Sequence, residues 1–100
     1  MFVISFDLNT LEAIKRHPKG VRQAYRDIAK VLEKYGFKRV QLSVFAAQDE
    51  NLLDLIRAAN ALKDLEWFKF CVKNIRAFRM EHGTDLTALF QDRLSDAPKP

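Results

Sequence analysis

Hydrophobic and polar residues alternate with a period of two over residues 1–8, which predicts a strand at the start of the chain. The even-numbered face is apolar throughout and is expected in the core; its members are Phe2, Ile4, Phe6 and Leu8. The other face holds Val3, Ser5 and Asp7. Because an unpaired buried carboxylate is costly, Asp7 is expected on the face away from the core. Asp7 is therefore the first candidate for chemistry, and the alternative is an aspartate that only ends the strand.

Residues 19–35 show the helical spacing of three and four most clearly. The apolar positions are Val21, Ala24, Tyr25, Ile28, Val31, Leu32 and Tyr35. Gly36 follows, where a left-handed helix cap belongs. The opposite face carries four cations at intervals of four, namely Arg22, Arg26, Lys30 and Lys34. Since like charges at this spacing slightly destabilise a helix, the stripe fits either an ordinary solvated face or a contact with a polyanion.

Two shorter segments lie on either side of the helix predicted at residues 19–35. Residues 9–18 are expected to form a loop with a helical turn around Leu11 and Ile14. Residues 37–47 alternate again, as one long strand or as two short strands joined sharply. One face of this segment is predicted to hold Val40, Leu42 and Val44, and the other Arg39, Gln41, Ser43 and Phe45.

The second half of the chain predicts helices followed by a strand. A helix capped by Asp49 or Asn51 is expected to run to about Lys63. A short helical segment at 65–71 contributes three aromatic residues that we expect in the core, Trp67, Phe68 and Phe70. Residues 74–81 alternate as a strand, a last helix is expected at 85–93, and residues 95–100 are a polar tail.

This order of elements predicts an α+β protein with a ferredoxin-like split βαβ sandwich, βαββαβ plus a short C-terminal helix. One domain would span residues 1–94, with 95–100 as a flexible tail. The helices would cover one sheet face. The open face would then hold polar residues and two apolar ones, namely Asp7, Ser43, Gln41, Arg39, Val3 and Phe45. Because open faces with apolar content usually find a partner, we expect a homodimer packed through or beside this face.

Composition and charge narrow the class of protein. The net charge is +4, and nine Lys or Arg lie between Lys15 and Arg39 against two acids, which favours an anionic partner. The single cysteine, Cys71, excludes an internal disulfide and a thiolate metal site, and it suits a reducing compartment. The sequence shows neither a signal-peptide pattern nor an apolar run that could span a membrane. We therefore expect a cytoplasmic protein with no membrane partner.

Short motifs are spread over about residues 2–90: Phe6-Asp-Leu8, His17-Pro-Lys-Gly-Val21 running into Ala24-Tyr25, Gly36-Phe37, Gln41 with Ser43, Asn60-Ala-Leu-Lys63, Trp67, and Ile75-Arg-Ala-Phe78. In this order and spacing they resemble the bacterial virulence-associated protein D (VapD) family. The opening strand and the run Gln41-Leu-Ser-Val-Phe45 are also similar to the small CRISPR-associated adaptation endonucleases, the structural cousins of that family. Two residues depart from the family pattern: Leu42 stands where glycine is common, and Asn74 where aspartate is common.

The resemblance implies a ferredoxin-like homodimer with endoribonuclease activity, often the toxin of a toxin–antitoxin pair that binds a small antitoxin protein. It implies a catalytic role for Asp7 and a supporting one for Ser43. Leu42 argues against a tight hairpin at that point, and Asn74 removes a charge near the expected site. We therefore expect the family fold to be kept, whereas the departure at Asn74 bears directly on activity.

If RNA is the substrate, two routes fit the residues. Two Asp7 carboxylates across a two-fold axis could hold Mg²⁺, or Asp7 could act without metal as a general base on the ribose 2'-hydroxyl. Ser43 could donate to a phosphate oxygen. The arginines that could contact phosphate are Arg39, Arg76 and Arg79, with Arg22 and Arg26 of the basic stripe. For the first three of these arginines an ordinary salt bridge is an equal alternative.

Two further interpretations compete with the enzyme. The same dimer could be a non-catalytic nucleic-acid-binding or scaffold protein, or a small-molecule sensor. His17 and His82 lie in predicted loops, where each could act as an acid or base or be incidental. The sequence contains no phosphate-binding glycine loop, no nucleophile elbow and no paired histidines at metal spacing.

Overall fold

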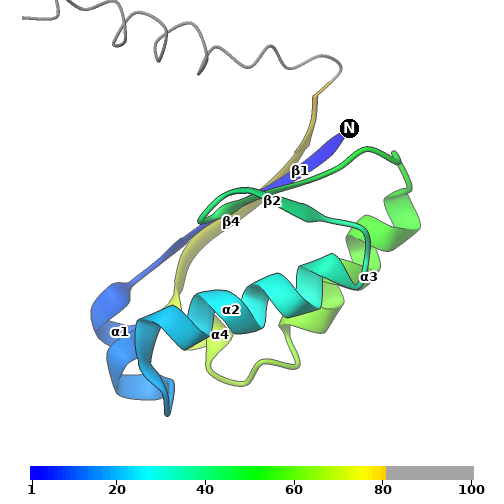
Figure 1. Cartoon of the computed structure of the whole chain (residues 1–100). Helices are drawn as coiled ribbons and strands as arrows, with labels where there is room; N and C mark the ends of the chain where they lie inside the picture. Colours follow the sequence, from blue (N-terminus) through cyan, green and yellow to red (C-terminus); the bar gives the residue numbers. More distant parts are fainter. Residues whose placement is uncertain (81–100) are drawn as a thin grey trace, which may run out of the picture.

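The computed structural model describes residues 1–80, which form an α+β unit with a four-stranded antiparallel sheet. Its elements are β1 (Phe2–Leu8), α1 (Thr10–Arg16), α2 (Gly20–Glu33), β2 (Lys38–Gln41), β3 (Val44–Ala47), α3 (Leu52–Leu62), α4 (Phe68–Cys71) and β4 (Val72–Arg79). The strand order is β2-β3-β1-β4, which is compatible with the predicted ferredoxin-like arrangement. Helices α2 and α3 lie against the same side of the sheet (Figure 1). The predicted helix at 85–93, the tail at 95–100 and His82 fall outside the described residues.

Strand β1 and helix α2 form the centre of the core, as their patterns predict. Ile4 and Phe6 are each 1% exposed, whereas Asp7 is exposed on the other face. Helix α2 buries the residues of its apolar stripe, Ala24, Ile28, Ala29 and Leu32. Gly36 follows the helix with φ +86°, a left-handed conformation that residues with a Cβ rarely adopt. The predicted cap of α3 is Asn51, whose side chain accepts from the amide of Asp54 at 3.2 Å.

The prediction for residues 37–47 is wrong in its assignment of faces. Phe45 pairs with Ile4, is 0% exposed and stacks on Phe6 with ring centroids 6.3 Å apart. Arg39 pairs with Phe45 and donates to the carbonyl of Tyr25 in α2 at 3.1 Å, so it too lies on the helix side. The cause is a register shift between Arg39 and Gln41, together with a turn at residues 42–43, which breaks the simple alternation. The expectation that Leu42 disfavours a tight hairpin is also wrong, because Leu42 and Ser43 form the turn that joins β2 to β3. Gln41 lies opposite Val44, on the open face.

Two other segments also differ from the sequence pattern. The expected loop after β1 contains the seven-residue helix α1, whose apolar residues Leu11 and Ile14 are both exposed. Phe70, predicted in the core, is 49% exposed, with the guanidinium of Arg16 4.3 Å from its ring centroid. Each segment buries other apolar residues, Ala13 in α1 and Phe68 and Cys71 in α4, so the apolar pattern alone does not separate the buried from the exposed positions. None of the helices within residues 1–80 has the length and apolar character needed to cross a membrane.

Candidate functional site

The pairing of β1 with β4 places two polar residues side by side on the open sheet face. Asp7 lies opposite Asn74, and the amide Nδ2 of Asn74 donates to Oδ2 of Asp7 at 3.2 Å. Directly after Asp7 the register shifts, so that Leu8 pairs with Val72. Such bulges re-aim side chains and are common beside active sites. Asp7 therefore occupies the last regular position of the strand, exposed and with one side-chain partner.

The neighbouring pair on the same face adds a hydroxyl and a cation. Ser5 lies opposite Arg76 on β4 and opposite Val44 on β3. Because Arg76 and Asp7 are diagonal neighbours in the antiparallel ladder, their positions are about 7–8 Å apart. Within residues 1–80 Arg76 is exposed and makes no ion pair. The open face near the end of β1 thus holds a carboxylate, an amide, a hydroxyl and a guanidinium. We call these four residues, Asp7, Asn74, Ser5 and Arg76, the Asp7 centre.

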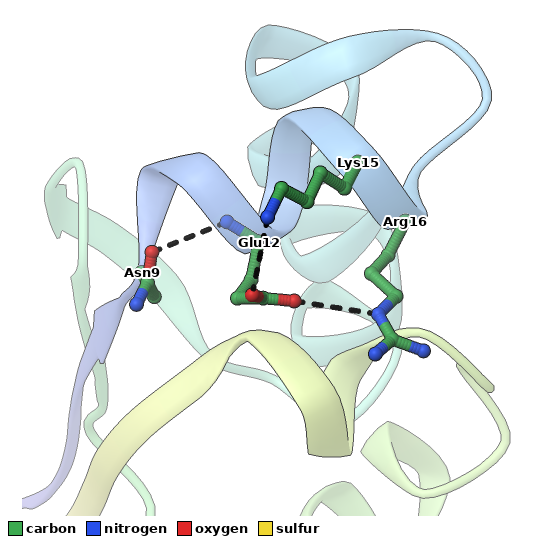
Figure 2. Close-up of polar contacts among 4 residues, drawn as sticks. All are labelled: Asn9, Glu12, Lys15 and Arg16. Atoms are coloured by element: carbon green, nitrogen blue, oxygen red, sulfur yellow. Dashed lines mark hydrogen bonds and ion pairs between the residues drawn. The ribbon is translucent and has the colours of Figure 1, made fainter.

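The chain that follows Asp7 is fixed by contacts at the start of α1 (Figure 2). The backbone amide of Asn9 donates to the carbonyl of Cys71 at 2.7 Å, and its side chain caps the helix by accepting from the amide of Glu12 at 3.1 Å. Glu12 in turn pairs with Lys15 at 4.0 Å and with Arg16 at 3.4 Å. The bond from Asn9 to Cys71 joins the start of α1 to the end of α4, which leads directly into β4, while the contacts of Glu12 lie within α1 and its cap.

The other predicted catalytic residue, Ser43, lies in the turn between β2 and β3. Its carbonyl accepts from the amide of Phe6 at 3.1 Å, and its side chain is partly exposed. The register therefore brings Ser43 level with Phe6 rather than with Asp7. Ser5 is not among the site residues predicted from the sequence. The alternation of β1 nevertheless places it on the same face as Asp7, and this was the signal that could have found it.

The predicted phosphate-binding arginines fall into three places. Arg76 belongs to the Asp7 centre. Arg79 forms an ion pair with Glu50, whose other oxygen lies 3.5 Å from the N-terminal amine. The hydrogen bond from Arg79 holds the pKa of Glu50 below its ordinary value. Arg22, Arg26 and Arg39 line a shallow pocket between α2 and the β2–β3 hairpin. The structure therefore does not gather all five arginines around Asp7.

Metal ligands are sparse around Asp7. Within residues 1–80 there is no group of three or more His, Cys, Asp or Glu side chains that could hold a metal ion. Magnesium is often bound by one or two carboxylates, with waters and substrate phosphate completing its six ligands. Within residues 1–80 the Asp7 centre holds a single carboxylate, so a magnesium ion bound there would take its other oxygen ligands from water, a second subunit or the substrate.

For His17 the sequence leaves open an acid or base or an incidental loop residue, and the structure gives it a structural role. It is 6% exposed and lies edge-on to Trp67, with ring centroids 5.1 Å apart. Nδ1 accepts from the amide of Lys19 at 3.0 Å, so the neutral ring carries its proton on Nε2, which donates to Asp27 at 2.7 Å. Both ring nitrogens are occupied, and the pair joins the loop after α1 to helix α2.

The carboxylate of Asp27 is held by more than one donor. Gln23 donates to its second oxygen at 2.9 Å. Burial raises the pKa of Asp27, but the hydrogen bonds from Gln23 and His17 and the nearby positive charges together lower it by a larger amount. The net shift of the pKa is therefore downward. Cys71 is also buried, and burial raises the pKa of its thiol, as expected of an unreactive packed cysteine.

Comparisons with known proteins agree on one family. The model of the family described as CRISPR associated protein Cas2 matches residues 1–85. The chain is 47% identical over 89 residues to the "Endoribonuclease VapD homolog" of Neisseria gonorrhoeae, covering 89% of this chain and 97% of that protein. It is 46% identical over 87 residues to "Endoribonuclease VapD" of Haemophilus influenzae, covering 87% and 94%. Identity to "Endoribonuclease VapD" of Helicobacter pylori is 34% over 91 residues, covering 89% and 97%.

Proposed function

The chain belongs to the VapD family, which is related to the CRISPR associated protein Cas2, and we propose that it is an endoribonuclease that cleaves RNA at the Asp7 centre. Relatives named endoribonuclease match it over almost their whole length. The observation that carries the proposal is the exposed carboxylate of Asp7, held by Asn74 at 3.2 Å beside a strand bulge. Asp7 keeps oxygen lone pairs free to accept a proton or to bind a cation.

Each member of the Asp7 centre has a role in cleavage under this proposal. Asp7 activates the attacking oxygen, and Asn74 fixes the orientation of its carboxylate. Arg76 neutralises charge that builds up on the scissile phosphate, for which its guanidinium fork is suited. Ser5 on β1 and Ser43 in the β2–β3 turn are candidate donors to phosphate oxygens.

Two routes lead from Asp7 to a broken phosphodiester bond. In the first, Asp7 takes the proton of the ribose 2'-hydroxyl, the 2'-oxygen attacks the adjacent phosphorus, and the bond between phosphorus and the 5'-oxygen breaks. The 5'-oxygen takes a proton from water and leaves as a hydroxyl, giving a cyclic phosphate. In the second, two Asp7 side chains from paired subunits would hold Mg²⁺, which would supply electrostatic stabilisation of the phosphate and an activated water. A cyclic phosphate product points to the first route, and a linear phosphate points to the second.

The proposal includes a homodimer, built on the ferredoxin-like fold, that packs through or beside the open sheet face. That face carries apolar side chains among its polar ones, including Phe78, which is 45% exposed. A two-fold axis beside the exit of β1 would bring a second Asp7 close to the first. Size-exclusion chromatography with light scattering measures the mass, and a monomer at the concentration used for cleavage would contradict this part of the proposal.

The biological setting follows from the family resemblance. We infer a cytoplasmic toxin that is neutralised by a small antitoxin protein. The buried, unpaired Cys71 supports a reducing compartment. Expression with and without the neighbouring genes tests this inference: growth arrest by the active protein, relieved by a co-purifying small protein, supports it, and harmless expression of the wild type alone contradicts it.

The test of the activity is cleavage of a labelled single-stranded RNA by wild type, Asp7→Ala and Asp64→Ala, with magnesium and with chelator. Asp64 is an exposed carboxylate outside the Asp7 centre and serves as the matched control. Cleavage by wild type and Asp64→Ala but not by Asp7→Ala supports the proposal. If no variant cleaves and all bind RNA, the protein is the non-catalytic nucleic-acid-binding or scaffold protein; if all cleave equally, the reaction does not use Asp7.

A further inference from the structure

A second cluster of cations lies on the helix side of the sheet, beside edge strand β2. Arg22 and Arg26 of α2 and Arg39 of β2 line a pocket of about 410 Å³, together with Val21, Tyr25 and Leu42. We call it the arginine pocket. Among the described residues, none that lines the pocket is acidic, and the ion pairs within residues 1–80 involve none of its arginines. Because three guanidinium groups around one pocket repel one another, an anion is the ligand that the pocket suits.

The walls of the arginine pocket are anchored to the core. Nη2 of Arg39 donates to the carbonyl of Tyr25 at 3.1 Å, and its Cζ lies 5.4 Å from the centroid of the Phe45 ring. The ring of Tyr25 packs against Phe6 with centroids 6.1 Å apart. A guanidinium has five N–H donors, so Arg39 keeps donors for a ligand after its bond to Tyr25. A group held in this way loses less conformational freedom when the ligand binds.

The arginine pocket is also close to the Asp7 centre through the backbone. Asp7 follows Phe6, the amide of Phe6 is bonded to the carbonyl of Ser43 at 3.1 Å, and Ser43 follows Leu42, which lines the pocket. From Cα to Cα along this path the distance is no more than about 13 Å. The β2–β3 turn is therefore the short connection between the two sites, with Asp7 on the open face and the arginines on the helix side.

We propose that the arginine pocket binds a backbone phosphate of the RNA strand outside the scissile nucleotide, with the strand passing around the β2–β3 turn. This inference rests on the proposed function and adds a second contact site for its substrate. Proteins that bind single strands combine cations that follow the backbone with apolar or aromatic surface that contacts the bases. Val21, Tyr25 and Leu42 supply the apolar surface here. A rigid duplex cannot turn so sharply, so the substrate class is single-stranded RNA.

The first test measures binding of a labelled single-stranded RNA in the Asp7→Ala background, where no cleavage interferes. Arg22→Ala/Arg26→Ala is compared with Arg57→Ala/Lys63→Ala, which removes the same charge from exposed positions of α3 and its C-cap outside the pocket. We expect the first pair to raise Kd about tenfold and the control pair to change it less than about twofold. The slope of log K against log salt should fall by about 1.4 for the first pair, as for two lost phosphate contacts on a single strand. Equal effects of the two pairs would overturn the inference.

The second test separates the arginine pocket from the Asp7 centre. In the otherwise wild-type protein, Arg22→Ala/Arg26→Ala should raise KM for a long RNA about tenfold and leave kcat and the cleavage of a dinucleotide unchanged. A dinucleotide is too short to reach both sites, so a loss on this substrate as well would contradict the inference. If the wild type cleaves no RNA, the proposed function fails, while the binding titration in the Asp7→Ala background still decides whether the pocket holds RNA.

Discussion

Asp7 and Asp27 both accept a hydrogen bond from a side chain elsewhere in the chain, but their surroundings differ. Asp7 is exposed and, within residues 1–80, receives one side-chain hydrogen bond, from Asn74 at 3.2 Å. Asp27 is partly buried and receives bonds from Gln23 at 2.9 Å and from His17 at 2.7 Å. The carboxylate of Asp7 retains free acceptor capacity, whereas that of Asp27 is largely used by the fold. Two residues of one type thus divide between reaction and stability according to exposure and unused hydrogen-bonding capacity.

The largest effect should come from Asp7→Ala. The rate of RNA cleavage is expected to fall by about 100-fold or more, because the group that activates the attacking oxygen is gone. The free energy of unfolding should change by less than about 0.5 kcal/mol, since the side chain is exposed. Single-turnover cleavage and urea denaturation measure the two quantities. A large loss of stability would place Asp7 in the same class as Asp27.

His17→Ala should show the opposite profile. It leaves Asp27 without its shortest hydrogen bond and opens space beside Trp67, so we expect a loss of about 2–4 kcal/mol in the free energy of unfolding. Cleavage per folded molecule should be unchanged. Lys19→Ala is the control, because the backbone amide that His17 accepts from is kept; it should cost less than about 0.5 kcal/mol. If His17→Ala instead lowers cleavage per folded molecule while its free energy of unfolding stays close to that of wild type, His17 acts as an acid or base in the reaction.

Asn74→Asp sharpens the comparison at the Asp7 end. Two carboxylates at hydrogen-bond distance cannot both ionise freely, so the pKa of Asp7 should rise. If Asp7 acts as a general base, the acidic limb of the pH–rate profile moves to higher pH. The rate at neutral pH should change only a few-fold. The profile is measured in chelator and again in magnesium; an unchanged acidic limb with a lower magnesium requirement would instead favour the metal route.

The smallest effect is the contribution of Asp27 to the loss of stability at low pH. Its pKa is lowered in the folded protein, so its contribution to stability is present above the ordinary value of 3.8 and is lost as the pH falls from there through the folded pKa. Urea midpoints of wild type should therefore decline below about pH 4 more steeply than those of Asp27→Asn. Parallel curves for the two proteins would show that Asp27 does not contribute to this decline.

The parts of the fold that could be predicted from sequence are those with one clearly buried face. The alternation in β1 and the apolar stripe of α2 both report burial directly. Two short strands in residues 37–47 were one of the predicted alternatives, but their buried faces could not be predicted in this way, because Val40 and Leu42 are apolar yet exposed and the register shifts between Arg39 and Gln41. The full length of α1 could not be predicted either: only a helical turn around Leu11 and Ile14 was expected in that loop, and both side chains are exposed in the helix.

The candidate site was predicted only in part. Asp7 was found because a charge in an apolar strand must lie on the solvent side. Its hydrogen bond to Asn74 joins residues 67 positions apart, and strand register between such distant segments is set by tertiary packing rather than by local pattern. The arginine pocket combines residues from α2 and β2, and its existence depends on the face taken by Arg39, which the alternation assigned wrongly.

The pairing of β1 with β4 has a consequence for the order in which the protein gains activity during synthesis. β1 is made first and β4 is the last strand among the described residues, so closing the ladder between them requires a long loop to form. A nascent chain released before residue 74 has Asp7 but neither Asn74 nor Arg76. An RNA-cleaving protein built in this way completes its Asp7 centre only when most of its chain has left the ribosome, and truncated products do not carry the complete centre.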